Sequence, residues 1–136
     1  MINKPKCCLL LEDDPEQQED FIDALHSVSP DTGCYAVSNG EEALSVLFNE
    51  GFMPDYIFTD IHMPKMDGFE FLKTVKGNNE LKNVPVIIYS SDYSEIQIEK
   101  ATSLGATAIV PKDGLDALQN MLRNYLSDSS SFKAIH

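Results

Sequence analysis

Five short apolar runs alternate strictly with segments of helical periodicity along this chain, and this alternation limits the fold more than any other feature of the sequence. The runs show little polar alternation, which is typical of strands that are buried on both faces. They cover Cys7 to Leu11, Cys34 to Val37, Tyr56 to Thr59, Val86 to Tyr89 and Thr107 to Val110. Because parallel strands need crossover connections, the pattern predicts a doubly wound α/β domain with five parallel strands and five helices.

Each run is followed by a segment whose apolar residues recur at helical spacing, so each segment offers one apolar stripe to a core. In chain order the stripes are Phe21, Ile22, Leu25 and Val28; Leu44, Leu47 and Phe48; Phe69, Leu72 and Val75; Ile98, Ala101 and Leu104; and Leu115, Leu118, Met121, Leu122, Tyr125 and Leu126. Acidic residues mark three helix starts, at Asp14, Asp67 and Asp113, because a carboxylate can accept N–H groups of the first turn. Gly105 marks the end of the fourth helix.

Composition narrows the classes of partner. The 136 residues fit one domain, which we expect over residues 1–128, with a frayed polar tail at 129–136. A net charge of -12 argues against direct nucleic-acid binding, whose affinity comes largely from Lys and Arg. No apolar run could span a bilayer and the start lacks a signal-peptide core, so we expect a cytoplasmic protein without membrane contact. Cys7, Cys8 and Cys34 lack metal-ligand spacing and predict reduced core thiols.

Polar side chains follow four of the five predicted strands. Glu12, Asp13 and Asp14 follow the first, Asp60 follows the third, Ser90 and Ser91 follow the fourth, and Lys112 follows the fifth. Because parallel strands point their carboxyl ends to one edge, where open sheets bind ligands, we expect these side chains to converge. Crowded carboxylates repel one another unless a proton or a cation lies among them, and oxygen ligands without His or Cys favour Mg²⁺.

A carboxylate beside Mg²⁺, with an ammonium group and a hydroxyl nearby, has the parts needed to accept a phosphoryl group. Asp60 is the predicted nucleophile because it stands alone at the end of a central strand, before a turn that Pro64 makes rigid. Lys112 and the metal would neutralise the phosphoryl oxygens, and Ser90 would donate a hydrogen bond to one of them. Glu12 and Asp13 would then hold the metal.

The same residues resemble the receiver domain of two-component response regulators, the CheY-like family. The resemblance runs from Cys7 to about Leu126 and rests on Glu12-Asp13, the Asp60 to Gly68 segment with Met63-Pro64 and Met66-Asp67-Gly68, Pro85-Val86 before Ser90, and Gly105-Ala106 before Lys112. It implies a flavodoxin-like sheet with strand order 2-1-3-4-5. It also implies a stand-alone receiver over residues 1–128, a signalling domain and not an enzyme beyond its own phosphorylation and dephosphorylation.

The resemblance further implies that a histidine kinase or a histidine phosphotransfer protein donates a phosphoryl group to Asp60, which then switches binding of an unidentified downstream protein. Ser90 would be the switch hydroxyl and Lys112 the lysine that pairs with the phosphate. The implied Mg²⁺ ligands are Asp13, Asp60, the backbone carbonyl of His62 and, nearby or through a water, Glu12. The sequence leaves the oligomeric state open, a homodimer included.

Three positions depart from the commonest pattern of this family. Ile109 stands where a switch aromatic is usual, so no aromatic rotamer change there can report the phosphorylated state. Asp113 follows Lys112 where proline is usual, so we expect a trans peptide bond between them. Ser91 replaces a small alanine and would narrow access to the site. Asp92 is a further candidate modulator, which would steer the water that hydrolyses the phosphoaspartate.

Two other functions stay open at this stage. A Mg²⁺-dependent phosphohydrolase with an aspartyl nucleophile would share the acids, the hydroxyl and the lysine, but it normally has a second aspartate where this chain has His62. A receiver-like binding module that is never phosphorylated would need none of these site residues. Since all of them are present, phosphorylation of Asp60 is the favoured hypothesis.

Overall fold

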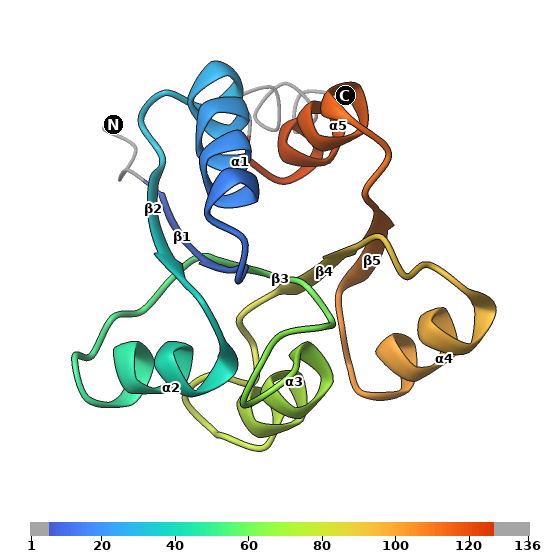
Figure 1. Ribbon diagram of the computed structural model, residues 1–136. Coiled ribbons are helices and arrows are strands. Elements are labelled where there is room, and N and C mark those ends of the chain that lie inside the picture. The colour runs from blue at the N-terminus through green and yellow to red at the C-terminus, as the bar shows by residue number, and fades with distance from the viewer. Residues whose placement is uncertain (1–5, 127–136) are drawn as a thin grey trace, which may run out of the picture.

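The computed structural model describes residues 6–126, which form a five-stranded parallel sheet with helices on both faces (Figure 1). In chain order the elements are β1 (Cys7–Leu11), α1 (Pro15–Val28), β2 (Gly33–Val37), α2 (Gly40–Phe48), β3 (Tyr56–Thr59), α3 (Gly68–Lys76), β4 (Val86–Ser90), α4 (Glu95–Ser103), β5 (Ala108–Pro111) and α5 (Leu115–Leu126). The strand order β2-β1-β3-β4-β5 confirms the doubly wound fold and the order that the resemblance implies.

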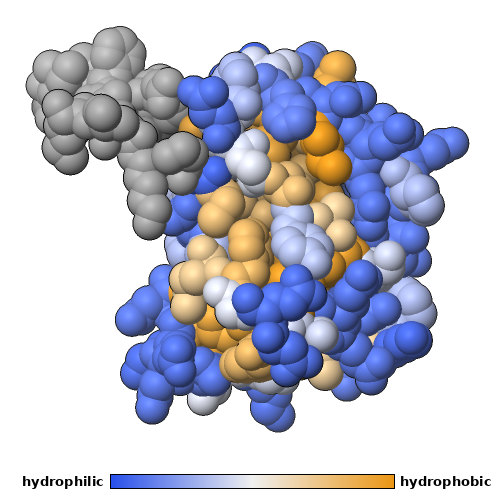
Figure 2. All heavy atoms as spheres, turned by 90° about the vertical axis from the view of Figure 1, so that its left-hand side faces the viewer, coloured by the Kyte–Doolittle hydropathy of each residue, from blue (hydrophilic) through white to orange (hydrophobic). Residues whose placement is uncertain are grey.

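The strands lie close to their predicted positions, and β1 and β3 have the predicted bounds. The fifth strand includes Pro111, which a central strand would exclude because proline cannot donate to the ladder; β5 is an edge strand, where proline is tolerated. The other edge is β2, on the side that Figure 2 turns to the viewer. Hydrophobic residues lie in the middle of this face, with hydrophilic residues on either side of them.

Two of the three predicted helix starts are confirmed. The Asp14 side chain accepts a hydrogen bond from the Glu16 N–H, and Asp67 forms a capping box with Glu70. The prediction for Asp113 is wrong, because the first helical acceptor is the carbonyl of Gly114, which bonds the Leu118 N–H. The N-terminal boundary of α5 is therefore set by a glycine at φ 93°.

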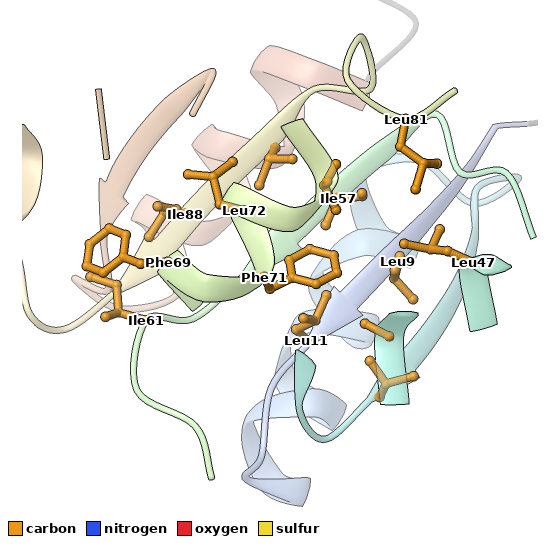
Figure 3. Close-up of a cluster of buried hydrophobic side chains, with 14 of the residues drawn as sticks. Leu9, Leu11, Leu47, Ile57, Ile61, Phe69, Phe71, Leu72, Leu81 and Ile88 are labelled. Carbon is orange, nitrogen blue, oxygen red and sulfur yellow. The ribbon is translucent and has the colours of Figure 1, made fainter. Parts of the chain in front are cut away.

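The core is divided by the sheet. Side chains from α2 and α3 pack with Leu9, Ile57 and Ile88 on one face (Figure 3), and α1 and α5 cover the other face with Cys8, Leu10 and Phe58. Two predicted core residues are exposed instead: Phe48 by 49% and Leu115 by 59%. Both stand at a helix end, where the stripe runs past the area that the sheet covers.

The fourth helix covers its part of the sheet sparsely. Only Ala101 is buried in α4, whereas Ile98 and Leu104 are half-buried. Gly105 follows at φ 92°, as expected of the residue that ends the helix. No helix within residues 6–126 is long and apolar enough to cross a bilayer. The predicted tail at 129–136 lies outside the described residues.

Candidate functional site

Three carboxylates meet at the carboxyl edge of the central strands. Leu11 and Thr59 are register partners in β1 and β3, so the next residues, Glu12 and Asp60, leave the sheet side by side. Oxygen atoms of Glu12, Asp13 and Asp60 all lie within 4.8 Å of one another. Glu12 is buried, Asp60 is half-buried and Asp13 is exposed, so the cluster opens to solvent on the Asp13 side.

Lys112 reaches this cluster from the end of β5. Its backbone N–H donates to the Ser90 carbonyl (3.0 Å), which extends the β4–β5 pairing by one residue. Its Nζ donates to Oε1 of Glu12 (2.8 Å), to Oδ2 of Asp60 (2.8 Å) and to Oε1 of Gln17 (2.5 Å). The Lys112 and Asp60 side chains are each 13% exposed, so this ion pair is largely shielded from water.

Neighbouring backbone groups fix both central acids. Oδ1 of Asp60 accepts from the Ile61 N–H (2.7 Å), and Oε2 of Glu12 accepts from the Asp14 N–H (3.1 Å). Gln18 in α1 donates through Nε2 to the Glu12 carbonyl (2.6 Å). Each carboxylate therefore keeps a defined orientation without help from an added ligand.

The pKa shifts follow from this packing. Burial raises the pKa of Glu12 above its ordinary value, and the hydrogen bond from Lys112 offsets only part of that effect. Burial lowers the pKa of Lys112, but hydrogen bonds with Asp60 and Glu12 outweigh it and raise the pKa overall. Because two acids share the lysine, Lys112 stays charged, whereas its charge offsets only part of the effect of burial on the pKa of Glu12.

The β3–α3 loop is packed tightly beneath Asp60. A Cβ atom added to Gly68 would overlap the carbonyl oxygen of Asp60, so only glycine fits there. Met66 donates its N–H to the Pro64 carbonyl (2.8 Å) across Lys65, whose φ is 68°. This three-residue turn is uncommon for a residue with a side chain, and it holds the loop close to the strand end.

Ser90 lies buried at the end of β4. Its Oγ accepts from the Asp92 N–H (3.1 Å). The Asp92 carboxylate bonds the His62 ring (2.7 Å) and Nε2 of Gln97 (2.8 Å), which links the β3–α3 loop to α4. Ser91 is exposed.

Ile109 is half-buried and packs against the core cluster on the α2–α3 side of the sheet. Its register partner is Ile88 of β4. No peptide bond within residues 6–126 is cis, which confirms the trans bond expected between Lys112 and Asp113.

A family model for the response regulator receiver domain matches residues 8–123. The chain belongs to the response regulator receiver family. Receiver domains are signalling domains. In this one, Glu12, Asp13 and Asp60 form the acidic edge, and Lys112 pairs with two of these acids.

Relatives and solved structures agree with this assignment. The receiver domain is 36% identical to the chemotaxis protein CheV2 of Helicobacter pylori over 68% of this chain and 30% of CheV2, so it spans less than a third of that protein. The crystal structure of the phosphorylated cyanobacterial phytochrome response regulator RcpA is 26% identical, with a TM-score of 0.81 over 89% of this chain and 91% of RcpA. The Mn²⁺-bound form of the response regulator Rcp1 is 25% identical, with a TM-score of 0.79 over 95% and 94% of the two chains.

The donor set of this receiver domain fits a small divalent cation. Three carboxylates against one ammonium group leave two negative charges uncompensated when all are ionised. The donors are oxygen atoms only, which suits a hard ion such as Mg²⁺.

A cavity of about 530 Å³ adjoins Lys112 between α1 and α5 and is lined in part by Asp20, Tyr89 and Leu118.

Sequence reasoning missed the glutamines around the site of this receiver domain. Gln17 and Gln18 bond Lys112 and the Glu12 carbonyl, and Gln97 bonds Asp92. Gln17 carried a weak signal, because it lies in the first turn of α1, directly after the acids that end β1. The Asp92 contacts carried none, since they depend on the path of two loops.

Proposed function

We propose that this receiver domain accepts a phosphoryl group on Asp60 from a histidine kinase or a histidine phosphotransfer protein, and that the reaction depends on Mg²⁺. The observation that supports this most directly is the setting of the Asp60 carboxylate. One oxygen lies 2.8 Å from the Lys112 ammonium, and the group lies within 4.8 Å of the carboxylates of Glu12 and Asp13.

In the transfer, a carboxylate oxygen of Asp60 attacks the phosphorus atom of the donor phosphohistidine. The new P–O bond forms as the P–N bond breaks, and the leaving imidazole keeps the electron pair and takes up a proton. Lys112 stays charged, because its pKa is raised, and pairs with the phosphoryl oxygens. Ser90 accepts a hydrogen bond from Asp92, so its own hydrogen can be donated to a phosphoryl oxygen.

The cation would be held by Asp13, Asp60 and the backbone carbonyl of His62, with Glu12 near it or acting through a water. When bound, the ion neutralises charge on the oxygens of the transferring group. The oxygen-only donor set and its two uncompensated charges support Mg²⁺ in this role.

Phosphorylation must then change what the domain binds. A shift from 1:99 to 99:1 between two conformations needs a bias of about 5.5 kcal/mol. A single hydrogen bond from Ser90 to a charged phosphate supplies about 1.5 to 3 kcal/mol. We therefore expect Lys112, the cation and the loop after β4 to share the bias and to repack α4, which buries only Ala101. Ile109 is aliphatic, so the change cannot pass through an aromatic rotamer at that position.

The downstream partner would bind the face formed by α4, β5 and α5, over residues 94–126. Tyr93, just before this segment, and Ile96 in α4 are both exposed and would extend this face. The proposal includes a cytoplasmic location, because a histidine kinase takes its phosphoryl group from ATP in the cytoplasm. Ser91 and Asp92 would tune the lifetime of the phosphorylated state from the loop above Ser90.

Intact-mass measurement after incubation with acetyl phosphate and Mg²⁺ tests the proposal. Phosphorylation adds about 80 Da to the wild type, and Asp60→Asn abolishes the gain. Chelation of the metal by EDTA and the substitution Asp13→Asn each lower the rate of the gain. Asp23→Asn is a matched control on α1, because Asp23 is exposed and lies outside the carboxylate cluster.

Three outcomes would contradict the proposal. A wild type that gains no mass with any phosphoryl donor would leave a binding module without phosphorylation. A mass gain that persists in Asp60→Asn would show that a residue other than Asp60 accepts the phosphoryl group. Sustained turnover of a phosphomonoester would point to a phosphohydrolase. A Ser90→Ala variant with full phosphorylation-dependent partner binding would overturn the switch role of the hydroxyl alone.

A further inference from the structure

Two cysteines on adjacent strands form a thiol pair that the acidic edge does not use. Cys8 of β1 and Cys34 of β2 are direct register partners. Both belong to the core cluster under α1 and α5, so their side chains lie on the same face of the sheet. We propose that Cys8 and Cys34 are a redox site, which a peroxide oxidises to an intramolecular disulfide.

The strand geometry permits this bond. Neighbouring strands lie about 4.8 Å apart, and disulfides join Cα atoms about 4.4 to 6.8 Å apart. The pair is reduced in the described structure, and each thiol shifts the pKa of the other, so the two groups are neighbours. Cysteines that are register partners on one face of a sheet can therefore be joined by a disulfide between β1 and β2.

The two thiols differ in solvent exposure and in pKa, and these differences indicate which thiol reacts first with the peroxide. Cys34 is half-buried on the open edge strand, whereas Cys8 is fully buried (Figure 2 shows this edge). The hydrogen bond from Cys8 lowers the pKa of Cys34, while the bond and burial raise the pKa of Cys8. Cys34 is thus the attacking thiol and Cys8 the resolving thiol.

The reaction balances in two steps. The Cys34 thiolate attacks one oxygen of hydrogen peroxide, the O–O bond breaks, and the released hydroxide takes up a proton to give water and a sulfenic acid on Cys34. The Cys8 sulfur then attacks the Cys34 sulfur, the S–O bond breaks, and a second water leaves with the Cys8 proton. Two thiols have lost two electrons to the peroxide, and one disulfide has formed.

Cys7 does not compete for this bond. It precedes Cys8 in β1, so its side chain points to the opposite face of the sheet, where its Sγ lies 3.6 Å from the Met53 carbonyl. The pair is also remote from the acidic edge, because Cys8 precedes Glu12 by four residues, or about 13 Å along the strand. Oxidation would tie the edge strand β2 to β1 without touching Asp60.

The test treats the reduced full-length protein with hydrogen peroxide, denatures it and blocks remaining thiols with N-ethylmaleimide before intact-mass measurement. The wild type has three cysteines, and we expect it to lose two hydrogen atoms, about 2 Da, and to take up one maleimide instead of three. Reduction with dithiothreitol before blocking restores three. Asp60→Asn behaves in the same way, which separates this site from phosphorylation.

Variants identify the bonded pair, because peptide mapping cannot separate neighbouring Cys7 and Cys8. Cys7→Ser still loses two hydrogen atoms and takes up no maleimide. Cys34→Ser forms no intramolecular disulfide, and Cys8→Ala leaves a sulfenic acid on Cys34 that dimedone captures. The wild-type result does not depend on whether Cys8→Ala folds. Uptake of three maleimides by the oxidised wild type, a disulfide that disappears in Cys7→Ser, or a bond between two chains would each overturn the proposal.

Discussion

The helices α3 and α4 cover the same face of the sheet and have the same length, but they are held very differently (Figure 1). Five residues of α3 are buried, whereas Ala101 alone is buried in α4. The strands beneath them differ in the same way, since the last three residues of β3 are buried and none of the four residues of β5 is. The molecule therefore has a firmly packed half and a loosely packed half.

The difference separates two tasks. Glu12 and Asp60 emerge from β1 and β3, where burial and backbone hydrogen bonds hold them in place. Regions with few buried apolar contacts open at the lowest free-energy cost, so α4 is the element that a local change can move most easily. Lys112 connects the two halves, because it leaves β5 and bonds both acids.

The largest expected effect tests the packing contrast itself. Phe71→Ala removes a fully buried ring from α3, and we expect it to lower the free energy of unfolding by about 3 to 5 kcal/mol. Ile96→Ala in α4, where the side chain is 75% exposed, should change it by less than about 0.5 kcal/mol. Urea unfolding of both variants measures the difference. Equal losses would mean that the two helices are held alike.

Lys112→Met tests the connection between the halves. It leaves Glu12 and Asp60 without their shared ammonium, and we expect a loss of about 3 kcal/mol at neutral pH. Glu12 already has a raised pKa because of burial, and removal of the hydrogen bond that lowers it raises that pKa further. A carboxyl group with a raised folded-state pKa stabilises the fold below its unfolded pKa, and this stability is lost as the pH rises through the folded value.

The loss in Lys112→Met should therefore grow as the pH rises from 4.5, the ordinary pKa of Glu12, toward neutrality. Urea unfolding at several pH values measures it. Addition of Mg²⁺ should recover part of the stability at neutral pH by replacing the missing positive charge. Lys82→Met, at an exposed lysine outside the site, is the matched control. A pH-independent loss would show that the packing of the lysine stem matters more than its charge.

Gly68→Ala tests how tightly the loop below Asp60 is packed. The added methyl group would overlap the Asp60 carbonyl oxygen, and we expect a loss of about 1 to 3 kcal/mol. Gly33→Ala is the control, because no heavy atom lies within 4 Å of the added Cβ there. Chemical shifts of the Ile61 amide, which donates to Asp60, should change only in Gly68→Ala. An unchanged Ile61 amide would mean that the loop can yield without moving the carboxylate.

The firmly packed half was also the easier half to predict. The bounds of β1 and β3 and the convergence of Glu12, Asp13 and Asp60 follow from strand pattern and parallel topology alone. The exposure of Phe48 and Leu115 could not be read from periodicity, because a stripe does not show where the sheet ends. The bonds of Asp92 to His62 and Gln97 depend on loop paths that only the packed structure sets. The register of Cys8 against Cys34 needed the strand order.

The smallest expected effect concerns the contact that ties the two loops together. Hydrogen bonds from His62 and then Gln97 hold the pKa of Asp92 below its ordinary value of 3.8. A depressed acid stabilises the fold above its unfolded pKa, and this contribution is lost as the pH falls through the folded value. His62→Ala should raise the Asp92 pKa toward 3.8, and Gln97→Ala should raise it less, as measured by the ¹³C shift of the carboxyl carbon. Amide hydrogen exchange at the start of α4 should be faster in His62→Ala, because the helix then loses its link to the loop after β3. Unchanged exchange would place the restraint on α4 elsewhere, and would leave the His62 contact as a property of the exposed loops alone.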